Sequence, residues 1–319
     1  MRRRLYVENW APHYGSPFEA DDEVSPATAE VQLEVESKGK PWQPRAGYDG
    51  GVESIAFIDG VRRIDARVTI DDPELGPVPG ICISLAYGAV IWDARARRSE
   101  IAEARVQRLA IFAQGQSVAV PQAGPTLRYR SESVPTSDPA ALTTVMQTRM
   151  RQAEGELGRE LARRGHLVIA DGPIHPLEPA SVVGYIKSQR AAYLPPEKVP
   201  CVAALGPGER TPLFVFSSGG SFARYSWYTR LEDIEHGHTW SGVARCECTG
   251  AFALEDASRL ADETTFLLPR FASAAHIEAR APQNLVPVAA LERHLRRLLG
   301  DQALVYRALC AAVAGTPLR

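Results

Sequence analysis

Two apolar runs that each end in Asp-Gly, with a long helix-forming segment between them, constrain the fold of this chain more than any other feature. The runs are Ile55-Ala-Phe-Ile-Asp59-Gly60 and His166-Leu-Val-Ile-Ala-Asp171-Gly172. A carboxylate at the end of a buried strand is costly to keep ionised unless another charge compensates it. Together with Glu154 in the segment between, the two aspartates indicate a bound divalent cation. Ordinary turn formation by Asp-Gly remains the alternative explanation.

The sequence around the first Asp-Gly predicts three antiparallel strands. Residues 52–70 alternate in the manner of a strand, and further apolar runs follow at 80–92 and at 108–113, the last continuing to 121. Short turn signals between these runs favour neighbours that pair as a meander. Residues 1–50 are rich in proline, glycine and charge, so we expect an N-terminal arm there, for dimerisation or partner docking, and one domain over residues 51–319.

A long helix is predicted from Ser137-Asp-Pro139 to about Arg164, with a stop at Gly165. Its apolar stripe includes Leu142, Val145, Met146, Met150, Leu157 and Leu161. At helical spacing Glu154 falls on this stripe, whereas Glu156 and Glu160 fall on the solvated side. An acid on the core-facing side needs a partner, so Glu154 is the candidate functional residue.

The remaining order of elements predicts an α/β fold. After the strand at 167–171 we expect a helix at 178–193, strands at 212–216, 225–230 and 242–248, and two helices from Leu291 onward. This order matches a ribonuclease H-like mixed five-stranded sheet flanked by helices, with additional strands and C-terminal helices. In such a sheet, acids from the first strand, the first helix and the fourth strand meet at one edge.

Composition excludes several classes of protein. With 319 residues and 45% hydrophobic content the chain can bury a sizeable core. Its 36 basic and 38 acidic side chains give no overall field that would attract nucleic acid. No apolar stretch is long enough to span a bilayer, so we expect no membrane partner and a cytoplasmic location. The five scattered cysteines are typical of reduced thiols rather than of disulfides or a zinc site.

Several short segments resemble the NurA family of nucleases, ribonuclease H-like enzymes that process DNA ends. They are Phe57-Ile-Asp-Gly-Val-Arg-Arg-Ile-Asp-Ala-Arg67, Arg149-Met-Arg-Gln-Ala-Glu-Gly-Glu-Leu157, Val168-Ile-Ala-Asp-Gly-Pro173, Val183-Gly-Tyr-Ile-Lys187 and Ala279-Arg-Ala-Pro-Gln-Asn-Leu-Val-Pro287 with Leu291-Glu-Arg-His294. By position, the resemblance implies that Asp59, Glu154, Asp171 and His294 form the metal site. His276 is the rival to His294, because Arg293 stands where the family usually has a small residue.

The expected chemistry follows from these residue types. Carboxylate oxygens suit Mg²⁺ or Mn²⁺, and an added imidazole shifts the preference toward Mn²⁺. Lys187, within a segment that resembles the family's Gly-x-x-Lys, is expected to be catalytic by neutralising the scissile phosphate, although a lysine on a helix is also an ordinary surface charge. Arg62, Arg63, Arg67 and Arg230 are the candidate DNA-binding residues, because basic and aromatic side chains interleave around the last of them. On the strand that continues from Asp59, we expect Arg63 and Arg67 to share a face and Arg62 to take the other.

The sequence thus predicts a metal-dependent deoxyribonuclease that acts on single-stranded DNA and DNA ends. The resemblance implies a homodimer working with a HerA-type hexameric ATPase in DNA repair or phage defence. The chain has no Gly-x-x-x-x-Gly-Lys-Ser/Thr loop, so ATP hydrolysis would come from that partner. Two alternatives remain open, namely a ribonuclease H-like nuclease on RNA or DNA junctions, and a catalytically inactive adaptor of the same fold.

Overall fold

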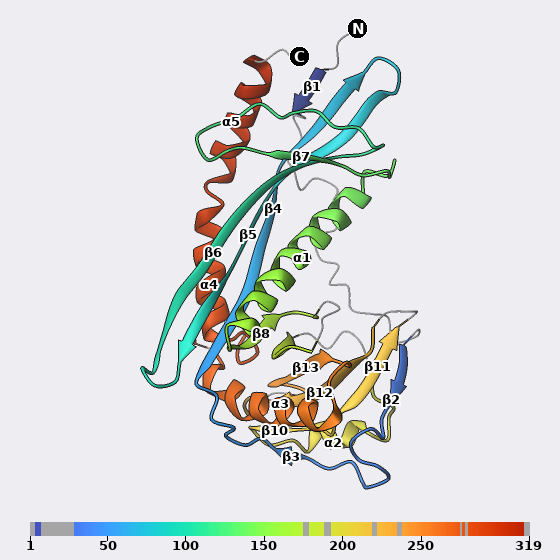
Figure 1. Ribbon diagram of the computed structural model, residues 1–319, viewed down its shortest axis with the longest axis vertical. Coiled ribbons are helices and arrows are strands. Elements are labelled where there is room, and N and C mark those ends of the chain that lie inside the picture. The colour runs from blue at the N-terminus through green and yellow to red at the C-terminus, as the bar shows by residue number, and fades with distance from the viewer. Residues whose placement is uncertain are drawn as a thin grey trace.

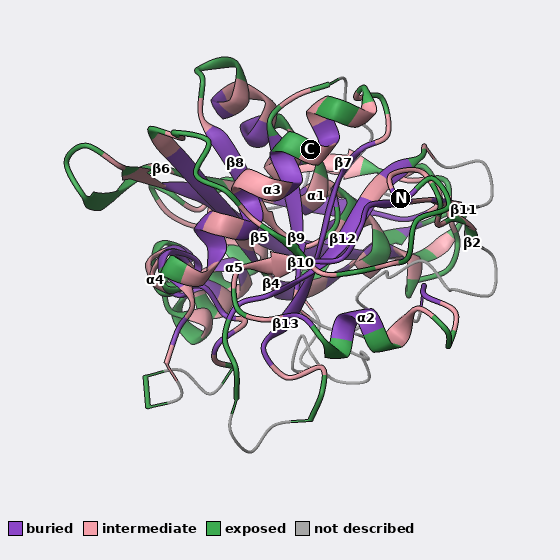
Figure 2. Cartoon of the chain, turned by 90° about the horizontal axis from the view of Figure 1, so that it is seen from below, coloured by how far each residue is buried: buried purple, intermediate pink, exposed green. Residues whose placement is uncertain are grey.

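The protein is described by a computed structural model. The structure describes residues 4–7, 29–174, 179–187, 193–218, 222–234, 238–274, 276–277 and 280–315. One mixed β-sheet dominates this part of the chain, with helices on both faces (Figure 1). Figure 2 shows that the strands near the centre of the sheet are largely buried.

The strands and helices occur in the following order along the chain. The strands are β1 (Arg4–Val7), β2 (Ala29–Gln32), β3 (Arg45–Ala46), β4 (Ser54–Asp72), β5 (Gly76–Asp93), β6 (Arg98–Phe112), β7 (Arg130–Ser133), β8 (Leu167–Asp171), β9 (Val182–Ile186), β10 (Glu209–Arg210), β11 (Phe214–Ser218), β12 (Arg224–Arg230) and β13 (Val243–Thr249). The helices are α1 (Ala141–Arg163), α2 (Val199–Ala203), α3 (Leu254–Leu267), α4 (Val286–Leu298) and α5 (Gln302–Gly315), with a 3₁₀ turn η2 (Leu268–Phe271).

The predicted three-strand meander is confirmed. β4 pairs antiparallel with β5, and β5 pairs antiparallel with β6. β6 begins about ten residues earlier than the apolar pattern indicated, because its first half is exposed and carries alternating charges. The predicted continuation to residue 121 is wrong: the backbone of Gln114 has φ +57°, which ends the extended conformation just beyond Phe112.

The sheet is larger than the five strands predicted. Its main path runs β2-β11-β12-β13-β9-β8-β4-β5-β6-β7, and β1, β3 and β10 pair beside this path, which makes 13 strands among the described residues. β8 lies parallel to β4, and β9 lies parallel to β8. Because β13 pairs antiparallel with β9, the later strands extend the same sheet instead of forming a second layer.

The predicted helix at 178–193 is wrong where the structure describes it. Residues Val182–Ile186 form the buried strand β9, next to β8. Two adjacent valines favour a strand. Gly184 also favours close packing here, since a Cβ on it would lie 2.8 Å from the carbonyl oxygen of Gly172. The outer parts of the predicted helix, 178 and 188–192, lie outside the described residues.

Helix α1 is confirmed with the predicted register. It begins at Ala141, just after the predicted start at Ser137-Asp-Pro139, and ends at Arg163 with Arg164 as its C-cap. Gly165 follows with φ +91°, as a helix-terminating glycine does. Its buried residues are Leu142, Met146, Met150, Ala153, Leu157, Gly158 and Leu161, close to the predicted stripe. Glu156 is exposed. The helix therefore presents Glu154 toward the sheet.

Helix α4 covers the opposite face of the sheet from α1. Val61 on β4 packs against Leu291 and Leu295 of α4, while the neighbouring Gly60 faces α1. α4 and α5 are the two predicted terminal helices, and the first of them begins at Val286 rather than Leu291, with proline in its first turn. α3 was not predicted.

The described parts of residues 1–50 belong to the main sheet. β1 pairs with β4, and Leu5 is 5% exposed within the main core. β2 pairs with β11, and β3 pairs with β10. In these parts the predicted arm packs on the body of its own chain.

Candidate functional site

The two aspartates of the Asp-Gly pairs lie next to each other in the sheet. The parallel ladder between β4 and β8 pairs Ile58 with Ala170, so Asp59 and Asp171 follow side by side. β8 ends at Asp171, where Gly172 adopts φ +108°, so the turn explanation holds for this copy. It fails for the first copy, because β4 continues through Asp59 and Gly60 to Asp72. Beyond Asp171, β4 therefore continues without β8 as its neighbour.

Strand alternation assigns both aspartates to the face that α4 covers. Asp59 lies two residues before Val61 on β4, and Val61 packs on α4. Side chains two apart on a strand share a face. Asp171 is in register with Asp59 on the adjacent parallel strand, so it shares that face at the strand end.

Glu154 approaches the same point from α1, on the other face. A Cβ on Gly60 would lie 2.4 Å from Oε1 of Glu154 and 2.6 Å from Sδ of Met150. Only glycine at position 60 lets the helix come this close without displacing the glutamate. The second residue of the first Asp-Gly thus admits the third carboxylate beside Asp59.

Lys187 is the basic group of the site. It follows β9 directly, and its Nζ donates to Oδ2 of Asp171 at 2.6 Å and to Oδ1 of Asn284 at 2.8 Å. Both Lys187 and Asp171 are largely buried, with 19% and 18% of their side chains exposed. The lysine is therefore placed by a strand rather than by the helix that the sequence analysis predicted.

Burial raises the pKa values of all three acids, and repulsion from the neighbouring acids adds to this for Asp59 and Glu154. For Asp59, burial and then the charges of Asp171 and Glu154 raise the pKa well above its usual value. For Glu154, burial and the charge of Asp171 raise the pKa to about 8, although Arg62 and Arg151 oppose this. Burial also raises the pKa of Asp171, against the attraction of Lys187. Each side chain keeps some contact with solvent, so a soluble ion can reach the group.

A small pocket joins two of the acids. Glu154 and Asp171 both line it, together with Arg151 and the loop residues Pro173 and Ile174. Its volume of about 30 Å³ is enough for a water molecule or an ion but not for a nucleobase. A larger group such as a nucleotide would have to bind outside it.

The donor chemistry of the site fits a divalent cation, although no closed site is formed. Three carboxylates with one lysine leave excess negative charge in a largely buried place, which a hard cation would neutralise. Within the described ranges, no three His, Cys, Asp or Glu side chains are already gathered closely enough to hold a metal ion.

The two candidate histidines differ in their position. His294 is half-buried on α4, the helix that covers the face of Asp59 and Asp171, whereas His276 is exposed in a turn. Glu292, also on α4, adds its charge to the factors that raise the pKa of Asp171. The assignment of His294 as a metal ligand stays a prediction.

The four candidate DNA-binding arginines are placed differently from one another. A β-bulge between Ile64 and Ala66 shifts the register, so Arg63 opposes Ser84 while Arg67 opposes Ile81. The prediction that Arg63 and Arg67 share a face is therefore wrong. Arg62, which opposes Leu85, shares the α1 face with Arg67 instead.

Two of these arginines have structural hydrogen bonds. Arg63 binds Oδ1 of Asp65 and the carbonyls of Leu299 and Gly300, which fastens the end of α4 to the sheet. Arg230 is 6% exposed, and its guanidinium donates to carbonyls that include those of Leu205 and Ser241. Of the four, Arg62 is the exposed one.

Sequence reasoning missed three residues around the acids. Asn284, Glu292 and Arg151 lie within segments that carried the family resemblance but were given no role. Two of them could have been found from their positions near predicted site residues: Glu292 lies two residues before His294, and Arg151 lies three residues before Glu154. Asn284 offered no pattern, because its partner Lys187 is distant along the chain.

Comparisons with known proteins identify no family. No protein-family model matches this chain, and no curated protein matches it. A search of solved structures finds similarity to the catalytic domain of human Endonuclease V, with 15% sequence identity and a TM-score of 0.30. That match covers 79% of this chain and 85% of the other. A TM-score this low does not establish a common fold or activity.

Membrane-spanning helices are absent from the described part of the chain: none of its helices combines the required length and apolarity.

Proposed function

We propose that this protein is a divalent-cation-dependent nuclease that hydrolyses phosphodiester bonds in DNA. The observation that carries the proposal is the convergence of Asp59, Glu154 and Asp171 from three separate elements around the end of β8. The raised pKa values of all three acids support the binding of a cation there, since a positive charge would stabilise their ionised forms. Perturbed carboxylates that meet at a strand end mark a functional site more often than a structural one.

In this proposal the three carboxylates hold Mn²⁺ or Mg²⁺, and His294 completes the set. The cation would neutralise the acids and lower the pKa of an attacking water. Lys187 supplies the positive charge for a non-bridging phosphate oxygen, since its ammonium already lies 2.6 Å from an oxygen of Asp171. Arg62 is exposed and on the α1 face near Glu154, which supports a contact with the DNA backbone.

The central strand order β6-β5-β4-β8-β9 supports a ribonuclease H-like arrangement for this site. It has three antiparallel strands followed by two parallel ones, with α1 between the third and fourth strands in sequence. From the resemblance to NurA nucleases we further propose a homodimer that processes DNA ends with a HerA-like hexameric ATPase, in repair or phage defence.

The test compares the wild-type protein with Asp59→Asn on end-labelled single-stranded DNA, duplex DNA and RNA, with Mn²⁺, Mg²⁺ or EDTA. We expect cleavage of single-stranded DNA by the wild type with Mn²⁺ and none by the variant. Cleavage of RNA alone would change the substrate class. No cleavage of any substrate by the wild type would favour the inactive adaptor.

The partner proposal has its own experiment. Light scattering at micromolar concentration should give the mass of a dimer, and a HerA-like ATPase with ATP should increase the rate of digestion. A monomer whose activity is unchanged by the ATPase would contradict both parts.

A further inference from the structure

Asn284 has an arrangement that packing does not explain. It is fully buried, in the loop that leads into α4, and its Oδ1 accepts a hydrogen bond from Nζ of Lys187 at 2.8 Å. Its Nδ2 is buried and has no hydrogen-bond partner among the residues that the structure describes. An unpaired buried donor costs free energy that an apolar residue of similar size would avoid. The contact with Lys187 is therefore the one feature of the side chain that favours an amide at this position.

The loop that carries Asn284 is held in place without Lys187. The hydroxyl of Tyr185, on β9, donates to the carbonyl of Gln283 at 2.7 Å. The backbone N–H of Asn284 donates to the carbonyl of Arg280 at 2.9 Å, and Leu285 is fully buried. Since these contacts fix the backbone, the amide oxygen offers Lys187 an acceptor whose position is independent of Asp171.

Lys187 thus has two acceptors, and a bound cation would compete for only one of them, Asp171. A cation bound to Asp171 would compete with the ammonium for that carboxylate, because both are positive and both need its oxygens. Lys187 would then retain only Asn284 as its protein partner among the described contacts. A long, flexible lysine without any partner would extend into solvent and lose its alignment.

We propose that Asn284 is the positioning residue that keeps the ammonium of Lys187 beside the acids when Asp171 is engaged elsewhere. The inference rests on the proposed function for the use of that ammonium, which is to meet a phosphate oxygen of the substrate. The positioning itself can be measured without metal or substrate.

The first experiment detects the side-chain ammonium of Lys187 by ¹⁵N NMR in the metal-free protein. A hydrogen-bonded ammonium exchanges slowly with water and gives a signal, which we expect in the wild type and in Asp171→Ala. We expect the signal to disappear in the Asp171→Ala/Asn284→Leu double variant. Persistence of the signal in the double variant would overturn the proposal.

The second experiment separates positioning from loop structure. Asn284→Leu should lower kcat about tenfold and change KM less than twofold, with a melting temperature equal to or above that of the wild type. In the Asp171→Ala background, where Asn284→Leu removes the Lys187 signal, Asn284→Asp keeps an oxygen acceptor and should preserve it. Gln283→Ala is the control in the same loop, because only its backbone is used, and it should behave as the wild type.

Tyr185→Phe distinguishes the structural alternative. If the amide only shaped the loop, removal of the Tyr185 hydroxyl in the Asp171→Ala background would reduce the Lys187 signal as much as Asn284→Leu does in that background, and that result would contradict the proposal. Should Asn284→Leu fail to fold, Asn284→Ala provides the same readout. An inactive wild type with the expected NMR pattern would refute the nuclease and leave the positioning role intact. An active wild type with unchanged kcat in Asn284→Leu, and a persistent signal in the Asp171→Ala/Asn284→Leu double variant, would refute the positioning alone.

Discussion

Two groups of buried charge in this protein are built in opposite ways. Around Arg210, the acids Glu36 and Asp262 are ion-paired with the guanidinium. Around Asp59, burial raises the pKa of three acids in spite of the nearby basic side chains. Both groups tie together segments that are far apart in the sequence. The difference separates a group that stabilises the fold from one whose charge is left for something else to neutralise.

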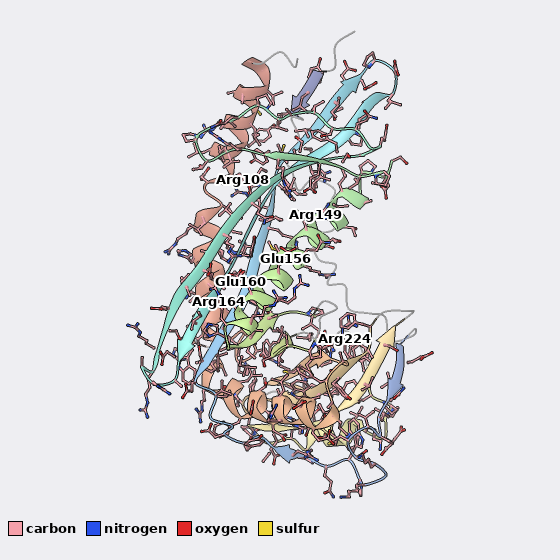
Figure 3. The ribbon with its side chains drawn as sticks, in the orientation of Figure 1. Arg108, Arg149, Glu156, Glu160, Arg164 and Arg224 are labelled. Carbon is pink, nitrogen blue, oxygen red and sulfur yellow. The ribbon has the colours of Figure 1, made fainter. Side chains whose placement is uncertain are left out.

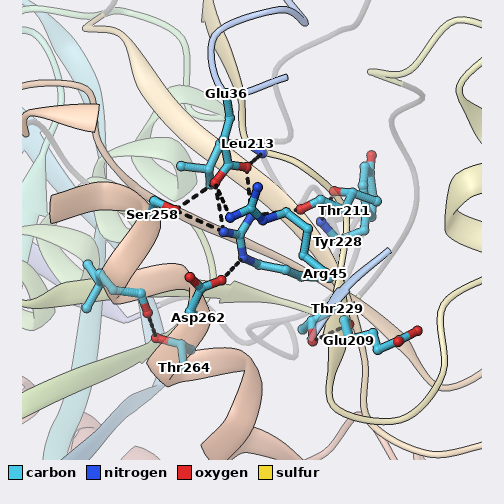
Figure 4. A network of polar contacts seen from close by, with 12 residues as sticks. Glu36, Arg45, Glu209, Thr211, Leu213, Tyr228, Thr229, Ser258, Asp262 and Thr264 are labelled. Carbon is cyan, nitrogen blue, oxygen red and sulfur yellow. Dashed lines mark hydrogen bonds and ion pairs between the residues drawn. The ribbon is translucent and has the colours of Figure 1, made fainter. Parts of the chain in front are cut away.

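The Arg210 network is closed (Figure 4). Arg210 is 0% exposed and donates to both carboxylate oxygens of Glu36 at 2.9 Å and to Oδ1 of Asp262 at 2.6 Å. Ser258 and the backbone N–H of Leu213 also donate to Glu36. These bonds hold the pKa of Glu36 at about 2 despite its burial. Buried charges that are paired and hydrogen-bonded in this way are tolerated by the fold.

The acid site shows the reverse effect on pKa. Burial and like charge raise the pKa of Asp59 and Glu154, and the same direction holds for Asp171 even with Lys187 beside it. The helix that carries Glu154 also carries an ion-paired glutamate on its outer side. Glu160 forms ion pairs with Arg105 and with Arg164, and Glu160 and Arg164 are labelled in Figure 3. One helix therefore holds both kinds of carboxylate: the outer Glu160 is ion-paired, whereas the pKa of the inner Glu154 is raised in spite of Arg62 and Arg151.

The largest expected effect comes from Asp59→Asn. The substitution keeps the shape of the side chain but removes a charge that the proposed cation needs, so cleavage of single-stranded DNA should fall about a thousandfold. Without metal, the melting temperature at neutral pH should be equal or higher, because the repulsion from Asp171 and Glu154 is removed. Cleavage at the wild-type rate would remove Asp59 from the site.

Arg210→Met should give the opposite result. It leaves Glu36 and Asp262 buried without their shared cation, which should lower the free energy of unfolding by about 3–5 kcal/mol. Urea denaturation measures this, and cleavage per folded molecule should be unchanged. Loss of activity in a fully folded Arg210→Met protein would erase the distinction between the two groups.

Acid denaturation provides the third test of the comparison. The pKa of Glu36 falls from 4.5 to about 2 on folding, so its stabilising effect is complete above pH 4.5 and disappears as the pH falls toward 2. At about 1.4 kcal/mol per pH unit, this amounts to about 3 kcal/mol. Stability measured from pH 6 to pH 2 should fall less steeply in Glu36→Gln, and the exposed Glu156→Gln should follow the wild type.

Local patterns in the sequence predicted the elements that place the acids. The alternating segment of β4, the apolar run of β5, the apolar stripe of α1 and the strand β8 are all present, because each depends on neighbours in sequence. The orientation of Glu154 toward the sheet follows from the apolar stripe of α1. The strand nature of β9 was missed, since five residues flanked by polar segments carry too little pattern to separate a strand from a helix.

Long-range pairings could not be predicted from the sequence. Glu36 and Arg210 are 174 residues apart, and Lys187 and Asn284 are 97 apart, so no local spacing relates them. The bulge between Ile64 and Ala66 also has no recognisable sequence pattern, yet because of it Arg67 shares a face with Arg62 instead of Arg63. The later strands β11 to β13 were predicted singly, but their addition to the main sheet depends on partners distant in sequence.

Two variants, Glu154→Gln and Glu156→Gln, compare the inner and outer faces of α1 directly. The first should lower cleavage about a hundredfold, because its carboxylate lies against Gly60 and lines the pocket with Asp171. The second is exposed and should be active at the wild-type rate. Equal activity of both variants would indicate a site without a helical acid.

The smallest effect is expected from the histidines, where the comparison depends on position alone. His294 lies on α4, which covers the face of Asp59 and Asp171, and His276 is exposed in a turn outside that helix. His294→Ala should therefore weaken Mn²⁺ binding and cleavage about tenfold, as measured by calorimetry and single-turnover rates. His276→Ala should leave both unchanged. The opposite ranking would mean that the loop before α4, rather than the helix, completes the metal site.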